Sequence, residues 1–133
     1  SGFSIFSITP SNGVNLQAEP ITVVFSHAVI AFGSDISELP TGKENPVALN
    51  VYRKSSKVDE VDISQLGQWR WITTSIARFD LRKDIPSWPR WPTDLYIEVS
   101  VNTALTSATN AVISGTNSRS WTTTNMIWNV QGV

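Results

Sequence analysis

Short runs of alternating apolar and polar residues are the feature that most limits how this chain can fold. A period of two places alternate side chains on one face of a strand, and residues 95–101 show it most clearly, through Leu95, Ile97, Val99 and Val101. The same alternation recurs in six further segments: about 3–8, 20–26, 46–52, 69–73, 76–81 and 119–124. Only residues 35–39 and 102–108 suggest even a short helical turn. The pattern therefore predicts an all-β chain.

Turn-forming residues separate the predicted strands. The first strand ends at Thr9-Pro10-Ser11-Asn12-Gly13, and two longer connections, residues 30–45 and 82–93, are punctuated by proline. Short strands separated in this way are typical of a sandwich with Greek-key connections. We therefore expect one Ig-like antiparallel β-sandwich of about seven strands over residues 1–124. Residues 125–133 are expected to be either an extra edge strand or the start of a following domain.

Composition restricts the partners and chemistry that this segment can have. A chain of 133 residues fits one domain, and 10 Lys and Arg residues against 11 Asp and Glu residues give a net charge of −1. Such a balance provides no field for collecting phosphates, so no nucleic acid partner is expected. The absence of cysteine excludes disulfides, thiolate metal sites and cysteine nucleophiles. No apolar run approaches the roughly 18 residues of a membrane helix, so membrane insertion is not expected either.

A series of short motifs carries a resemblance to a known family. In order, the motifs are Thr9-Pro10-Ser11-Asn12-Gly13, Val23-Val24-Phe25-Ser26, Gly67-Gln68-Trp69-Arg70-Trp71, Ala77-Arg78-Phe79-Asp80-Leu81, Leu95-Tyr96-Ile97-Glu98-Val99 and Trp121-Thr122-Thr123-Thr124. This order resembles the bacterial Ig-like domain found in S-layer proteins and in the N-terminal region of bacterial alpha-2-macroglobulin-like proteins. The chain departs from the family pattern at Ala28 and Leu81, where the family has proline, and in its Trp-rich stretch 86–92.

The resemblance implies a non-catalytic structural or interaction module of a large multidomain protein. It implies an extracytoplasmic location, whether periplasmic, cell-surface or secreted, and an alpha-2-macroglobulin-like inhibitor or defence protein is one such parent. Its partners would be the neighbouring domains of that parent. A structural module of this kind predicts apolar edges that match its neighbours, near Phe3–Phe6 and Met126–Val130.

Candidate catalytic and metal-binding residues are few. His27 is the single histidine, and no G-x-S-x-G elbow accompanies it, so a structural or exposed histidine is favoured over a Ser-His-Asp triad. Asp59, Glu60 and Asp62 lack the glycine and spacing of a calcium loop, which favours a solvated acidic turn. We therefore expect no enzyme, no catalytic residues, no metal and no cofactor.

The six tryptophans are the most informative residues. Trp69, Trp71 and Trp121 lie in predicted strands and are expected to fill the core. Trp88 and Trp91, with Arg90 between them, lie in a proline-rich loop, and loops are usually at the surface. An exposed Trp and Arg pair is typical of partner contacts, which predicts a loop that binds carbohydrate or protein through Trp88, Arg90 and Trp91. The alternative is that this loop folds back and caps one end of the sandwich.

Overall fold

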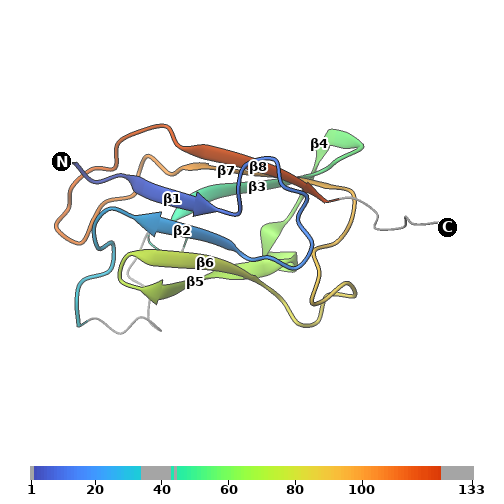
Figure 1. The fold of residues 1–133 in the computed structure, drawn as a ribbon, viewed down its shortest axis with the longest axis horizontal. Helices are drawn as coiled ribbons and strands as arrows, with labels where there is room; N and C mark the ends of the chain where they lie inside the picture. Colours follow the sequence, from blue (N-terminus) through green and yellow to red (C-terminus); the bar gives the residue numbers. More distant parts are fainter. Residues whose placement is uncertain (1, 34–42, 44, 124–133) are drawn as a thin grey trace.

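In the described part of the chain, eight strands form two antiparallel sheets that pack face to face (Figure 1). The computed structural model describes residues 2–33, 43 and 45–123, so the expectations for 35–39, 125–133 and Met126–Val130 lie outside the described residues. One sheet has the order β1-β2-β6-β5 and consists of β1 (Ile5–Thr9), β2 (Ile21–Phe25), β6 (Ile76–Leu81) and β5 (Gly67–Thr73). The other has the order β4-β3-β7-β8 and consists of β4 (Ser56–Val61), β3 (Val47–Arg53), β7 (Leu95–Val101) and β8 (Ser118–Thr123).

This strand order is that of an Ig-like sandwich, so the predicted fold class is confirmed. All seven predicted strands are present within one or two residues of their expected bounds. The eighth strand, β4, was not predicted, because its acidic residues Asp59 and Glu60 suggested a turn. A short 3-10 helix, η1 (Ile63–Gln65), then joins β4 to β5 in the opposite sheet. Residues 102–108 form hydrogen-bonded turns in place of the expected helical turn.

Alternate strand residues fill the space between the sheets. Leu95, Ile97 and Val99 are buried, as their spacing predicts. Burial of each such side chain stabilises the folded state by roughly 1.5–3 kcal/mol relative to leaving it exposed to water. The expectation that strand tryptophans belong to the core is also correct, since three of them are almost fully buried: Trp69, Trp71 and Trp121. Aromatic rings also meet across neighbouring strands of one sheet, as where Trp69 of β5 meets Phe79 of β6 edge to face at 5.5 Å between ring centroids.

The N-terminal segment contributes to both sheets. After β1 pairs with β2, the chain turns at Gly13, whose φ of 84° favours glycine, and residues 13–16 run parallel to β8. Gly13 N–H donates to the Ser120 carbonyl at 2.8 Å, and Leu16 N–H donates to that of Thr122 at 2.9 Å. This pairing covers the edge of β8, a place where an unpaired strand would otherwise attract another chain.

Candidate functional site

An open hollow of about 730 Å³ lies on the outer face of the sheet that contains β5 and β6. Its floor is made by the outward side chains of these two strands, because their inward neighbours Trp69 and Phe79 belong to the core. Its walls are residues 18–20, which precede β2, and the loop after β6, through residues 82–84 and 88–89. The hollow therefore brings together side chains from two strands and two loops that are distant in sequence.

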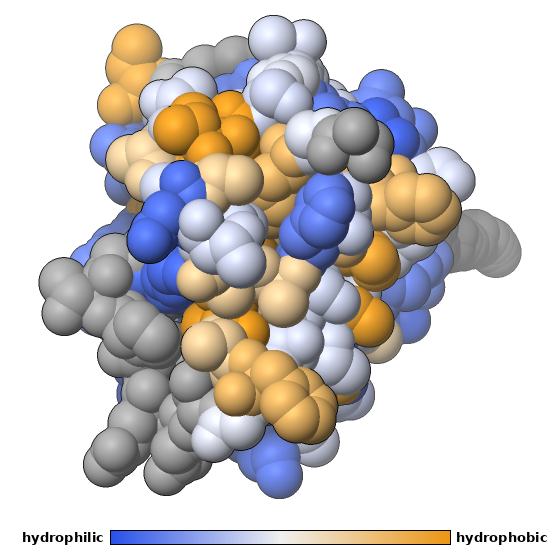
Figure 2. Space-filling view, turned by 90° about the vertical axis from the view of Figure 1, so that its left-hand side faces the viewer, coloured by the Kyte–Doolittle hydropathy of each residue, from blue (hydrophilic) through white to orange (hydrophobic). Residues whose placement is uncertain are grey.

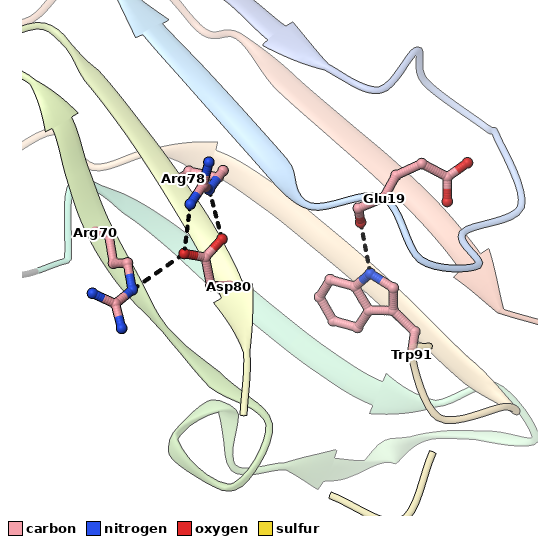
Figure 3. A network of polar contacts seen from close by, with 5 residues as sticks. All are labelled: Glu19, Arg70, Arg78, Asp80 and Trp91. Carbon is pink, nitrogen blue, oxygen red and sulfur yellow. Dashed lines mark hydrogen bonds and ion pairs between the residues drawn. The ribbon is translucent and has the colours of Figure 1, made fainter. Parts of the chain in front are cut away.

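Three charged residues form an ion network on the floor of the hollow (Figure 3). Arg78 donates to both carboxylate oxygens of Asp80, with Nε–Oδ1 at 2.6 Å and Nη2–Oδ2 at 3.0 Å. From the adjacent strand, Arg70 approaches the same carboxylate, with Nε 3.2 Å from Oδ2. The antiparallel register that pairs Arg70 with Arg78 places both guanidinium groups beside one acid. Asp80 therefore offsets the repulsion between two neighbouring cations.

The carboxylates at the walls are also engaged. Arg82 binds both oxygens of Asp84, at 2.9 and 2.6 Å, and this contact lowers the pKa of the Asp84 carboxyl and raises the pKa of the guanidinium. Glu19 Oε1 accepts hydrogen bonds from the backbone N–H groups of Gln17 and Ala18 at 2.8 and 3.1 Å. These hydrogen bonds, that of Gln17 foremost, hold the pKa of Glu19 below its ordinary value.

Among the residues that the structure describes, four cations and three carboxylates line the hollow. The carboxylates are Glu19, Asp80 and Asp84, and the cations are Arg70, Arg78, Arg82 and Lys83. Since the acids are held by backbone N–H groups or by arginine, the charge left for a ligand is positive. Lys83 has no ion pair among the described residues, and Arg70 uses only its Nε in the network. The hollow is thus a site with surplus positive charge on a nearly neutral chain.

Trp91 fixes the loop that forms one wall of the hollow. Its ring stacks on Phe79, and its exposed fraction is 3%. Its backbone N–H donates to the Gln17 carbonyl at 2.8 Å, and its indole Nε1–H donates to the Glu19 carbonyl at 2.9 Å, as Figure 3 shows for the latter. Trp91 therefore ties the loop after β6 both to the core and to the segment before β2.

This placement corrects the expectation of a contact surface made by Trp88, Arg90 and Trp91 together. Trp91 is buried because its ring fits over Phe79, and it thus follows the alternative in which the loop folds back and caps the sandwich. Arg90 is exposed, and its Nη2 donates to the Gln17 side-chain oxygen at 3.2 Å. Trp88 keeps 44% of its surface exposed and lines the hollow, with Lys83 Nζ 6.0 Å from its ring centroid.

Most residues of the hollow were not predicted from the sequence. Arg70, Arg78 and Asp80 are the outward residues of two strands whose inward residues are apolar, and the alternation contained that signal. Their convergence depends on the register of β5 against β6, which a single sequence does not give. Lys83 joins them only because the loop after β6 bends back toward β5.

Two other sets of candidate residues lie elsewhere. His27 is exposed, and its Nδ1 lies 2.9 Å from the hydroxyl oxygen of its neighbour Ser26. Of the three acids considered for calcium, Asp59 pairs weakly with Arg53 at 3.8 Å, and Asp62 caps η1 by accepting from Ser64 N–H. Within the described part of the chain, no group of three or more His, Asp or Glu side chains is arranged to hold a metal ion. Nor is any helix of the described residues long and apolar enough to cross a membrane.

Comparison with known proteins adds a likeness of fold. No family model and no curated protein matches the sequence. Among solved structures, the L,D-transpeptidase LdtMt1 in complex with imipenem superimposes with a TM-score of 0.50 and 15% identity, over 91% of this chain and 39% of that one. An L,D-transpeptidase from Mycobacterium smegmatis gives a TM-score of 0.49 and 18% identity, over 93% and 41% of the two chains. This chain thus spans about two fifths of each protein, and at such identity the likeness to the first concerns the fold alone.

Proposed function

We propose that this domain is a non-catalytic structural and interaction module of the Ig-like class, within a larger extracytoplasmic protein. The observation that carries the proposal is the path of the chain: β1 begins at one end of the sandwich and β8 ends at the opposite end (Figure 1). A domain with this geometry adds its full length when it is joined in series with others. It would serve as a spacer that also presents surfaces for docking.

Exposed apolar side chains support docking at the end where β1 begins. Figure 2 looks onto this end, where apolar residues lie among polar ones. Phe6 is 76% exposed, while Phe32 and Val112, in the loops after β2 and β7, are 98% and 70% exposed. Hydrogen bonds join these loops, since Ala108 N–H donates to the Ala28 carbonyl at 2.8 Å. A preceding domain of the parent protein would cover this surface, although Phe3, one of the residues expected there, is in the core.

The charged groups of the hollow favour binding over catalysis. Asp80 and Asp84 are each neutralised by arginine, and Glu19 is held by backbone N–H groups. A general acid or base needs a proton affinity close to the working pH. The contacts of Glu19 and Asp84 lower the pKa of both carboxyl groups, which is opposite to what a general acid requires.

The motif order described above supports the extracytoplasmic location and an S-layer or alpha-2-macroglobulin-like parent. One of its residues has a physical role in this fold: Gly67 begins β5 where this strand lies against the Asp80 carbonyl of β6. A Gly-x-Trp-x-Trp strand therefore combines close approach of two strands with two inward tryptophans.

A tandem chain tests the spacer function. Two copies of residues 1–133 would be joined end to end and compared with the single domain by small-angle X-ray scattering. A spacer predicts a maximum dimension near twice that of one copy and an unfolding midpoint equal to that of the single domain. A compact tandem, in which the copies pack side by side along their sheets, would contradict the proposal.

A further inference from the structure

The hollow over β5 and β6 has features that the spacer function does not use. It combines an exposed aromatic ring, surplus cations and a floor that is made of side chains. Each of these three properties restricts the chemistry of the ligand.

Hydrogen bonds within the loop hold the backbone that carries Trp88. Trp88 N–H donates to the Ile85 carbonyl at 3.1 Å, Arg90 N–H donates to the Ser87 carbonyl at 2.8 Å, and the Ser87 hydroxyl donates to the Arg90 carbonyl at 2.7 Å. Trp91 anchors the same loop to the core. Little conformational freedom is therefore lost when a flat ligand stacks on Trp88, which favours binding.

The cations of the hollow favour a ligand that carries an anionic group. Arg70 is 58% exposed at its side chain, and in Figure 3 its terminal nitrogens point away from Asp80. Lys83 Nζ lies over the Trp88 ring, 6.0 Å from its centroid, so positive charge is present at the surface on which a ligand ring would stack. A guanidinium group matches the planar geometry of a carboxylate, and this pairing gains strength in a partly desolvated hollow. A carboxylate carried by a ring-shaped ligand would satisfy both features.

The floor of the hollow argues for a sugar chain and against an extended peptide. Gln68 pairs with Asp80 and Arg70 with Arg78 in the ladder between β5 and β6. A peptide that adds to a sheet binds through backbone groups at a free strand edge, whereas this hollow lies on a sheet face. A sugar ring needs a flat aromatic partner together with side-chain donors and acceptors, and Trp88, Gln68 and Arg70 provide these.

We infer that this hollow binds a carboxylate-bearing oligosaccharide, with one sugar ring stacked on Trp88 and its carboxylates held by Arg70 and Lys83. The inference goes beyond the spacer function, and the two can fail separately, because the tandem measurement does not involve the hollow.

The test follows the indole N–H signals of the 133-residue chain by two-dimensional NMR during titration with two acidic probes, oligogalacturonate and hyaluronan oligosaccharides. We expect saturable shifts of the Trp88 signal with at least one of them, and an affinity that falls as salt rises, since the Debye length is only about 8 Å at 0.15 M. The methyl-esterified galacturonate has the same rings without the charge and should bind about tenfold more weakly.

Variants localise the site. Trp88→Ala should weaken binding about tenfold, and Arg70→Gln and Lys83→Gln should each weaken it several-fold and reduce its salt dependence. Two control variants change residues outside the hollow: Phe32→Ala removes an exposed aromatic ring, and Lys54→Gln removes an exposed cation. Both variants should bind the acidic probes with the affinity of the original chain. Unfolding midpoints of all variants would show that the fold is retained.

Four results would overturn the inference. The first is the absence of saturable shifts with both acidic probes, and the second is binding that survives both Trp88→Ala and Arg70→Gln. The third is equal affinity for the esterified and the acidic galacturonate. The fourth is displacement of the acidic sugar by oligoglutamate that binds with similar affinity. The last result would reassign the hollow to acidic peptides.

Discussion

Trp91 stacks on Phe79 with ring centroids 5.8 Å apart and an interplanar angle of 19°. Through this contact a residue of the loop between β6 and β7 becomes part of the core, and the wall of the hollow acquires a fixed position. Phe79 is itself an inward residue of β6, whose neighbours Arg78 and Asp80 face outward into the hollow. The same short strand therefore supports the core on one face and the candidate site on the other.

Replacing Trp91 should cost far more stability than replacing Trp88. Trp91→Ala removes a buried ring and the hydrogen bond to the Glu19 carbonyl, and should lower the free energy of unfolding by about 3–5 kcal/mol. Trp91→Phe keeps a ring over Phe79 and should cost less. Trp88→Ala, at a half-exposed position, should change the free energy of unfolding by no more than about 0.5 kcal/mol. Urea unfolding measures all three, and equal losses at the two tryptophans would refute the anchoring role.

Gly67→Ala should destabilise the domain because no side chain fits at this position. An added Cβ would overlap the Asp80 carbonyl oxygen and crowd Leu81, both backbone of the paired strand. Moving β6 away from β5 to relieve the overlap should cost about 1–3 kcal/mol or more. Gly2→Ala is the matched control, since its nearest neighbour would be the Ser114 hydroxyl at an ordinary 3.7 Å. The prediction fails if thermal unfolding gives both variants the same midpoint.

Trp69 and Trp71 are equally buried but differ in hydrogen bonding. Trp71 Nε1–H donates to the Lys43 carbonyl at 2.9 Å, whereas Trp69 Nε1–H has no partner among the described residues. Both variants to phenylalanine lose similar apolar contact, but only Trp71→Phe breaks a hydrogen bond. We therefore expect Trp71→Phe to cost about 1 kcal/mol more than Trp69→Phe in denaturant unfolding. A larger loss at Trp69 would contradict this account.

Asp80→Asn should destabilise the domain by about 1 kcal/mol at low salt, because Arg70 and Arg78 then repel each other without a compensating charge. The loss should shrink as salt is added, since these side chains are partly exposed. Asp84→Asn, which disrupts a more exposed pair with Arg82, should have a smaller effect. A salt-independent loss at Asp80 would show that the network does not act through charge.

The contribution of Glu19 should depend on pH with a definite sign. Its pKa in the folded chain lies below the ordinary value of 4.5, so its charged form is stabilised by folding. That stabilisation is present above pH 4.5 and is lost as the pH falls through the lowered folded value. Glu19→Gln should thus be less stable at neutral pH by under about 1 kcal/mol, since solvent screens the group. The difference should narrow in acid, and one that is constant across this range would contradict the assignment.

The alternation of residues by itself determined much of the fold. The alternation of apolar residues in segments such as 95–101 predicted the strands and their buried faces. A side-chain period of two is visible within one segment, without knowledge of the strand that pairs with it. Turn residues such as Gly13 gave the breaks between strands, and the motif order gave the Ig-like class. Strand β4 was missed because charged residues on both sides of Val58 obscured its pattern.

Tertiary structure alone decided where the candidate site lies. Arg70 and Arg78 meet at Asp80 because of the register between β5 and β6. That register results from the joint packing of many core residues, so neither segment encodes it alone. Trp88 and Trp91 look alike in the sequence, three residues apart in one proline-rich loop. Only packing against Phe79 separates them, because the loop can bury one ring in the space over β6, and the other is left at the surface to line the hollow.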